Sequence, residues 1–317
     1  MIKVALLFKF SLICFVTGKS MPKIGAPAST HFDYTNPQTW EEHESNCAGQ
    51  HQSPININTD EVIVKDYPKF TFQNYDLVFP ESLENNGHTV ELKIDNQDDD
   101  DDELPSISGG GLTDRYSFVQ LHFHWGEGLL GSEHTINRQK YSAELHIVHY
   151  NTKYGSFANA VPHADGLAVL GILIELQARD NIAFRHLEQF DKIIDPSRTI
   201  SDRLQFSVPL VDLLPDSTES FFRYNGSLTT PGCNEDVIWT VFETPIAISV
   251  RQLAKFRLLN DENGMPLRKN VRPTQMLHDR VVTYRRPDQH NSFQPLFPLF
   301  PDYSNLFKRE FQPSFNF

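Results

Sequence analysis

Residues Gln120-Leu-His-Phe-His-Trp-Gly126 are the most informative stretch of this 317-residue sequence. If the stretch is a β-strand, His122 and His124 lie on one face, two residues apart, and two aromatic side chains lie on the other. Two imidazoles on one face of a strand can act as paired ligands of a metal ion. The stretch therefore predicts a strand that carries part of a metal site.

A second stretch, Ala143-Glu-Leu-His-Ile-Val-His-Tyr150, supplies the third histidine. As a strand paired with the first, it brings His146 alongside His122 and His124. Three neutral imidazoles suit Zn²⁺ and leave a fourth tetrahedral position for water. A lone histidine in a strand is more often an ordinary core or surface residue, so the prediction of zinc depends on all three.

Two polar residues support these histidines. Gln120 and Glu144 each lie two positions before a predicted ligand, on the same face of its strand. Each can accept a hydrogen bond from the second imidazole nitrogen, which fixes the tautomer that binds the metal. We therefore expect zinc ligands that are held by outer hydrogen-bond partners.

From about residue 31 to residue 286, short apolar runs alternate with Pro, Gly, Asn and Asp, a pattern typical of strands. The clearest runs are Phe118–Trp125, Ala143–Tyr150, Leu167–Leu176 and Val237–Phe242. We expect two short helices, Phe184–Ile194 and Ser249–Leu259, the second capped by Ser249. Because no repeat or linker interrupts the region, residues 31–286 are predicted to form one mostly β domain.

Charge and composition narrow the classes of function. The chain has 28 Lys and Arg against 41 Asp and Glu, a formal net charge of −13. Phosphate backbones are bound by clustered basic residues, and because the sequence has no such cluster we expect no nucleic-acid partner. With 39% hydrophobic residues, the chain can bury a sizeable core.

The segment Met1–Gly18 has the features of a signal peptide. Lys3 precedes the run Val4–Val16, which is apolar except for Lys9 and Ser11, and small residues follow. The alternative is an uncleaved anchor, although the run is short for a membrane span. No later segment is long and apolar enough to cross a bilayer, so we expect a secreted, extracellular protein.

Removal of residues 1–18 also removes Cys14, which leaves Cys47 and Cys233. A pair of cysteines in an exported protein suggests one disulfide, and two free thiols are the alternative.

Two segments differ from the domain in composition. Residues 95–103 carry seven acidic residues in nine positions, which is typical of a solvated loop, with calcium or mineral contact as the alternative. Residues 287–317 contain seven Phe among Pro, Asn and Ser, without a helical or strand period. The sequence leaves open whether this tail is disordered, packs on the domain or binds a partner.

Taken with its other motifs, the sequence resembles the alpha-class carbonic anhydrases from about Tyr34 to Arg286. The matching segments, in the order of the family, are Gln52-Ser-Pro-Ile-Asn56, Asn86-Gly-His88, Gln120–Gly126, Ser132-Glu-His134, Glu144–His149, Asp165–Gly171, Gly226-Ser-Leu-Thr-Thr-Pro231 and Asn270-Val-Arg-Pro273. The resemblance implies a single domain with short helices and a central twisted, largely antiparallel mixed sheet. It also implies zinc-dependent, reversible hydration of CO₂ to bicarbonate and a proton, by attack of zinc-bound hydroxide on CO₂.

The resemblance assigns roles to further residues. Thr229 is expected to accept the hydroxide's hydrogen bond and to donate its own to Glu133, which orients the attacking oxygen. Thr230 lines the same position. His88 is expected to carry the released proton to buffer, since an imidazole titrates near neutral pH.

Other implied positions surround these. The residues that the resemblance places beside the proton path are Tyr34, Asn86 and Glu91, and those that it places in an apolar wall for CO₂ are Val148, Val169, Leu228, Val237 and Trp239. Asn270 is expected to support the zinc ligands from outside. Cys47 and Cys233 match a cysteine pair of exported members, which would tie the N-terminal segment to the loop after Thr229 and Thr230.

The sequence also departs from the family. The Gly-rich surroundings of Tyr34 are replaced by Asp33 and Thr35-Asn-Pro37, and Gly232 stands where many members have a second proline. Glu91 would place a carboxylate near the proton path and raise the pKa of His88. Asn225-Gly-Ser227 is an N-glycosylation sequon, which burial beside the active-site segment can leave unused.

Rival functions follow from the same pattern. A catalytically silent binding module can share this fold, but such proteins typically lose a zinc-binding histidine, and all three are present here. A role in mineral deposition through residues 95–103 is a further alternative, and ester hydrolysis is expected only as a side reaction.

Overall fold

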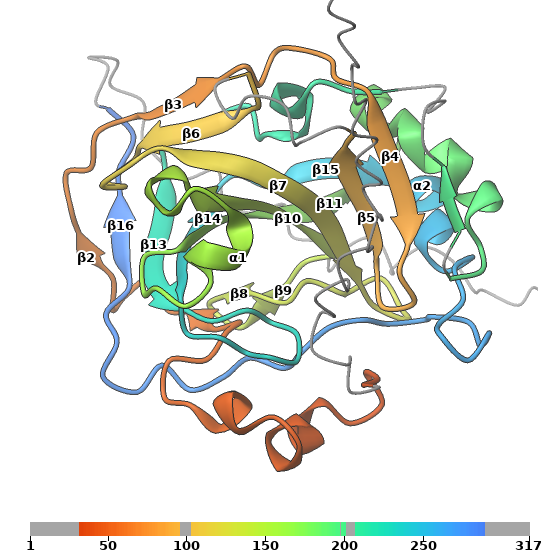
Figure 1. The fold of residues 1–317 in the computed structure, drawn as a ribbon, viewed down its shortest axis with the longest axis horizontal. Helices are drawn as coiled ribbons and strands as arrows, with labels where there is room; N and C mark the ends of the chain where they lie inside the picture. Colours follow the sequence, from red (N-terminus) through yellow and green to blue (C-terminus); the bar gives the residue numbers. More distant parts are fainter. Residues whose placement is uncertain (1–31, 96–102, 197, 201–206, 289–317) are drawn as a thin grey trace, which may run out of the picture.

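A computed structural model describes residues 32–95, 103–196, 198–200 and 207–288 (Figure 1). The predicted signal peptide lies outside the described residues. So do residues 96–102 of the acidic segment and residues 289–317 of the Phe-rich tail, so the expectations for these segments stay predictions.

Strands dominate the described part of the chain, in one 13-stranded sheet and one 3-stranded sheet. The strands are β1 (Asn56–Ile57), β2 (Ile63–Val64), β3 (Phe70–Gln73), β4 (Glu81–Asn85), β5 (Val90–Ile94), β6 (Ser106–Gly109), β7 (Tyr116–Trp125), β8 (Thr135–Ile136), β9 (Gln139–Lys140), β10 (Ala143–Asn151), β11 (Leu167–Gln177), β12 (Arg198–Ile200), β13 (Phe221–Gly226), β14 (Val237–Phe242), β15 (Ile246–Ser249) and β16 (Thr283–Arg285).

The large sheet runs in the order β12-β4-β5-β7-β10-β11-β14-β13-β16-β2, with β3, β6 and β15 paired beside this path. Strand β10 pairs antiparallel with both β7 and β11, whereas β11 pairs parallel with β14. Figure 1 shows β7, β10 and β11 crossing the centre of the twisted sheet. The prediction of a mostly β, largely antiparallel mixed sheet is therefore confirmed.

Both faces of the central strands are covered, so β10 is buried along its whole length. On one face a large apolar cluster includes Phe123 of β7 and Leu145 of β10, and on the other a second cluster includes Val148 and Trp239. Because successive residues of a strand point to opposite faces, these two clusters account for alternate positions along β7 and β10. The histidines share the face of the second cluster.

Helices are short. They are the α-helices α1 (Phe157–Ala160) and α2 (Val250–Phe256) and the 3₁₀ helices η1 (Pro37–Glu42), η2 (Ser45–Ala48), η3 (Thr152–Tyr154), η4 (Ile182–Lys192) and η5 (Leu210–Leu213). The cap predicted at Ser249 forms, because its hydroxyl accepts from the amide of Gln252 while the Gln252 side chain accepts from the Ser249 amide. The other predicted helix is the 3₁₀ helix η4, which begins at Ile182, after the cap at Asn181.

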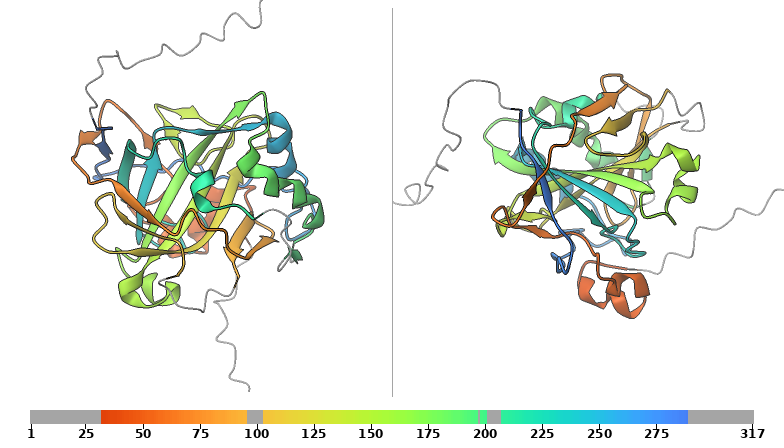
Figure 2. Two further views of the ribbon diagram at one scale, coloured as in Figure 1. Left: turned by 90° about the horizontal axis from the view of Figure 1, so that it is seen from above. Right: turned by 90° about the vertical axis from the view of Figure 1, so that its left-hand side faces the viewer.

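The N-terminal 3₁₀ helices η1 and η2 lie outside the sheet, at the lower edge of Figure 1 and of the right-hand view of Figure 2. A disulfide between Cys47 of η2 and Cys233 links this segment to the loop before β14, across a sequence separation of 186. The predicted cysteine pairing is therefore confirmed. Among the described residues, no helix has the length and apolar character needed to cross a membrane.

Candidate metal centre and active site

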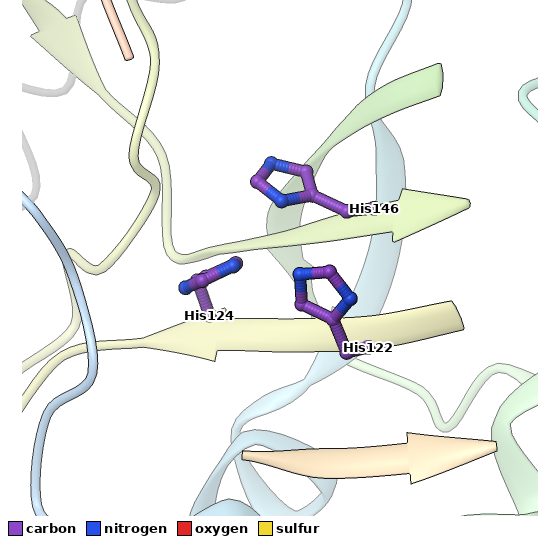
Figure 3. Close-up of side chains that lie close together, drawn as sticks. All are labelled: His122, His124 and His146. Atoms are coloured by element: carbon purple, nitrogen blue, oxygen red, sulfur yellow. The ribbon is translucent and has the colours of Figure 1, made fainter. Parts of the chain in front are cut away.

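Three histidines converge at the centre of the large sheet (Figure 3). His122 and His124 come from β7, and His146 comes from β10, directly opposite His122 in the strand register. One ring nitrogen from each histidine lies within 4.8 Å of the others. The alternation predicted from residues 120–126 therefore brings the three side chains together on one face of the sheet.

Each ring has an outer hydrogen-bond partner. Nδ1 of His122 donates to Oε1 of Gln120 at 2.9 Å, and Nε2 of His146 donates to Oε1 of Glu144 at 2.8 Å. Nδ1 of His124 donates to the main-chain carbonyl of Asn270 at 2.7 Å. These bonds leave Nε2 of His122, Nε2 of His124 and Nδ1 of His146 as the ligand atoms.

The residues fit a zinc ion. Nε2 of His124 is buried and has no hydrogen-bond partner in the described part of the chain, a costly state that a metal ligand bond would relieve. Burial, and then the nearby His124 and His146, hold the pKa of His122 well below its usual range, and burial lowers the pKa of His124. Neutral imidazoles are the form that binds metal, and three of them suit zinc.

A second group of possible ligands is a hydrogen-bond network instead. Glu144 uses both oxygens, because Oε2 accepts from the amides of Glu133 and His134 while Oε1 accepts from His146 and from Nδ1 of His134 at 2.6 Å. Nε2 of His134 lies 2.6 Å from the hydroxyl of Tyr224. Burial alone would raise the pKa of Glu144, but the two histidines hold it well below its usual range. The carboxylate therefore fixes His146 rather than binding a metal.

Glu133 lies beside the ligands and is fully buried. Its Oε1 accepts from the amide of Arg272 at 2.8 Å, and its Oε2 lies 4.0 Å from Nδ1 of His146. Within the described residues Oε2 has no hydrogen-bond partner, so the bond expected from Thr229 does not form in this structure. Thr229 itself is 4% exposed, and Thr230 is partly exposed.

The five apolar residues expected to face CO₂ belong to one cluster. Val148, Val169, Val237 and Trp239 are buried in it, and Leu228 is partly buried against it. Val148 and Val169 are register partners, and Val169 in turn pairs with Trp239. The Trp239 ring lies 4.7 Å from that of His146, between centroids, so the cluster adjoins the ligands.

His88 lies in the turn between β4 and β5, with its amide donating to Oδ1 of Asn86 and its carbonyl accepting from Asn270. Its ring stacks on Phe32 with centroids 3.9 Å apart, and its Nε2 lies 2.8 Å from Oε1 of Glu262. Sequence reasoning missed both contacts. Phe32 and Glu262 are far from His88 in the chain, and no pattern in the sequence signals the contact.

Two other expected neighbours of the proton path have defined partners. Tyr34 is buried and packs edge-on against Phe32 and Trp40. Glu91 pairs with Lys93 at 2.8 Å and lies opposite His122 in the sheet register. The carboxylate recorded at the His88 imidazole is that of Glu262.

Comparison with known proteins agrees with this site. The sequence model of the eukaryotic-type carbonic anhydrases matches residues 35–286. The chain is 40% identical to putative carbonic anhydrase 3 of Caenorhabditis elegans over 238 residues, which are 74% of this chain and 90% of the relative. It is 39% identical to carbonic anhydrase 15 of Mus musculus, over 78% of this chain and 79% of that protein. Identity to carbonic anhydrase 3 of Bos taurus is 35%, over 79% of this chain and 95% of the relative.

Proposed function

The chain belongs to the eukaryotic-type carbonic anhydrase family, and we propose that His122, His124 and His146 hold the zinc ion with which it reversibly hydrates CO₂. The observation that carries this proposal is the convergence of three imidazoles, two of them buried and that of His122 partly buried, each fixed by an outer partner that leaves one nitrogen facing the others. A catalytically silent binding module would not need three ligand histidines with their hydrogen-bond partners intact.

Zinc, when bound, supplies Lewis acidity that lets water ionise near neutral pH, a property established for this family. The protein's own contribution is to keep the ligands neutral and oriented. Gln120, Glu144 and the Asn270 carbonyl do this, since each fixes one imidazole tautomer.

Thr229 and Glu133 are proposed to orient the attacking oxygen. The unpartnered Oε2 of Glu133 supports this, because a carboxylate only accepts and the Thr229 hydroxyl is the donor expected there. A hydroxyl that donates to Glu133 can only accept from the reacting water, which restricts the direction of that water's lone pairs. Thr230 is proposed to line the same position.

The apolar cluster around Val148 and Trp239 is proposed to receive CO₂. A small, uncharged substrate without hydrogen-bond donors is best held by hydrocarbon, and the same wall keeps additional water away from the reacting atoms. The five apolar side chains belong to one cluster that adjoins the ligands at Trp239, which supports this assignment.

His88 is proposed to export the proton. In support, its imidazole is 17% exposed, and its main-chain carbonyl accepts from Asn270, the residue whose own carbonyl holds His124. His88→Ala should slow turnover in dilute buffer by roughly tenfold or more, with the rate restored by imidazole buffer. An unchanged rate in dilute buffer would refute the shuttle.

Secretion is proposed from the disulfide, which persists in oxidising compartments. We expect the mature protein in culture medium to begin after Gly18. Asn225 is exposed at the end of β13, so burial does not protect the sequon, and we propose that it is glycosylated. A mass shift on treatment with a glycosidase, absent in Asn225→Gln, is the expected result.

Stopped-flow CO₂ hydration by the zinc-loaded protein tests the proposed function. We expect rapid turnover that a sulfonamide abolishes and that His124→Ala lacks. A folded, zinc-replete protein without sulfonamide-sensitive turnover would instead support the silent binding module.

A further inference from the structure

The imidazole of His88 is held between two segments distant in the chain. Phe32, from the N-terminal segment, stacks on its face with an interplanar angle of 13°. Glu262, from the turn that follows α2, places Oε1 2.8 Å from Nε2. The ring is therefore fixed both in its plane and at the nitrogen that exchanges protons.

The approach of Glu262 depends on the local backbone. Gly87 has φ +87°, and a Cβ on it would lie 2.5 Å from Cγ of Glu262, so only glycine permits the two turns to meet so closely. On the other side, Oδ1 of Asp261 accepts from the amides of Asn263 and Met265, which fixes the turn that carries Glu262. The contact between His88 and Glu262 therefore depends on the conformation of both turns.

Several charged groups share the surroundings of His88. They line a hollow of about 220 Å³ and are Asp33, Glu127, Asp261, Glu262, Arg268 and Lys269, beside the neutral phenol of Tyr34. Glu127 pairs with Arg268 at 3.3 Å, and on β5 Glu91 pairs with Lys93. In the described part of the chain, the carboxylate of Glu262 lies within hydrogen-bond distance of the imidazole.

We infer that Glu262 is a positioning residue that holds the His88 ring at the mouth of the site and stabilises its protonated form. A carboxylate within hydrogen-bond distance favours the charged state of an imidazole, because the imidazolium N–H donates to it. This inference rests on the proposed shuttle role. In each turnover His88 takes up one proton and releases one to buffer, and Glu262 stays a carboxylate throughout.

The consequence is a shuttle that is more basic than an isolated histidine. It accepts protons readily from the site and returns to its neutral form only at higher pH or with a stronger buffer base. Stacking on Phe32 adds orientation, since it keeps Nε2 directed at Glu262 rather than free to rotate.

The test is an NMR titration of the His88 imidazole in the zinc-loaded protein, assigned by its absence in His88→Ala. Glu262→Gln keeps the size of the side chain and removes its charge, and it should lower the pKa of His88 by about 0.5 to 1 unit. The midpoint of the pH profile of kcat in dilute buffer should fall by a similar amount.

Glu127→Gln is the matched control, because it removes from the same hollow an acidic charge that, within the described residues, pairs with Arg268 and not with His88. It should leave the pKa of His88 unchanged. An unchanged pKa in Glu262→Gln, or an equal shift in both variants, would overturn the inference.

His88→Ala separates this failure from failure of the shuttle itself. If His88→Ala turns over at the wild-type rate in dilute buffer, the shuttle proposal fails, and the titration still decides whether Glu262 stabilises the imidazolium. If His88→Ala is slow and rescued by imidazole while Glu262→Gln keeps the wild-type titration and pH profile, only the role of Glu262 is refuted.

Discussion

Replacement of both Cys47 and Cys233 by serine should lower the free energy of unfolding strongly while leaving the metal ligands in place. The disulfide closes a loop with a sequence separation of 186, and the chain entropy that it removes from the unfolded state corresponds to about 5 kcal/mol. The ligands lie on β7 and β10, which pair with each other, and neither strand carries a cysteine of the bond, so we expect the ligands to keep their places. The N-terminal segment, by contrast, loses its covalent link to the loop before β14.

Urea unfolding followed by tryptophan fluorescence measures this effect. With a denaturant slope of about 3 kcal/mol per molar, the midpoint should fall by about 2 M, and wild-type protein in reductant should show the same fall. The zinc content of the variant at low urea should equal that of wild type. A shift of the midpoint below about 0.3 M at unchanged slope would refute the entropic argument.

Three further perturbations follow from the structure. Burial raises the pKa of Asp236 to about 7, and neither of its oxygens has a partner in the described part of the chain, so wild-type stability should fall as pH rises from about 4 through 7. Asp236→Asn should remove this fall in stability and raise the free energy of unfolding at pH 8 by on the order of 2 kcal/mol, measured by calorimetry. A variant whose stability still falls over the same pH range would contradict this. The lowered pKa of Glu144 gives stability the opposite dependence on pH. Its contribution to the free energy of unfolding is present above the unfolded pKa of about 4.3 and is lost as pH falls through the folded pKa. Acid unfolding curves of Glu144→Gln should lack this contribution, and curves that coincide with wild type in shape would count against it. Val148→Phe should lower kcat/KM for CO₂ roughly tenfold or more, because the larger ring occupies the space beside the apolar wall, while the zinc content stays unchanged. A variant with the kcat/KM of wild type would show that CO₂ binds elsewhere.

Local spacing made the centre of the fold predictable. Alternation in β7 and β10 placed three histidines on one face, and residues two positions earlier became their hydrogen-bond partners, because strand geometry repeats every two residues. The same periodicity could not reveal that β10 is buried on both faces, since this depends on two clusters assembled from distant strands.

Other features depend on contacts between remote segments. The sequence suggested Glu91 as the carboxylate near His88, whereas the structure records Glu262, which is brought there by the approach of two turns. The hydrogen bond expected between Thr229 and Glu133 is likewise absent among the described residues, because a family motif fixes residue types and not the exact rotamers. The helix expected at Phe184–Ile194 is the 3₁₀ helix η4, with non-helical dihedrals at Phe184.

X-ray absorption spectroscopy at the zinc edge of the zinc-loaded protein tests the central claim most directly. The account predicts four light-atom ligands at roughly 2.0–2.1 Å, three of them with the multiple scattering of imidazole, and loss of one imidazole in His124→Ala. A shell that contains sulfur, or fewer than three imidazoles in the wild-type protein, would contradict a zinc site built from His122, His124 and His146.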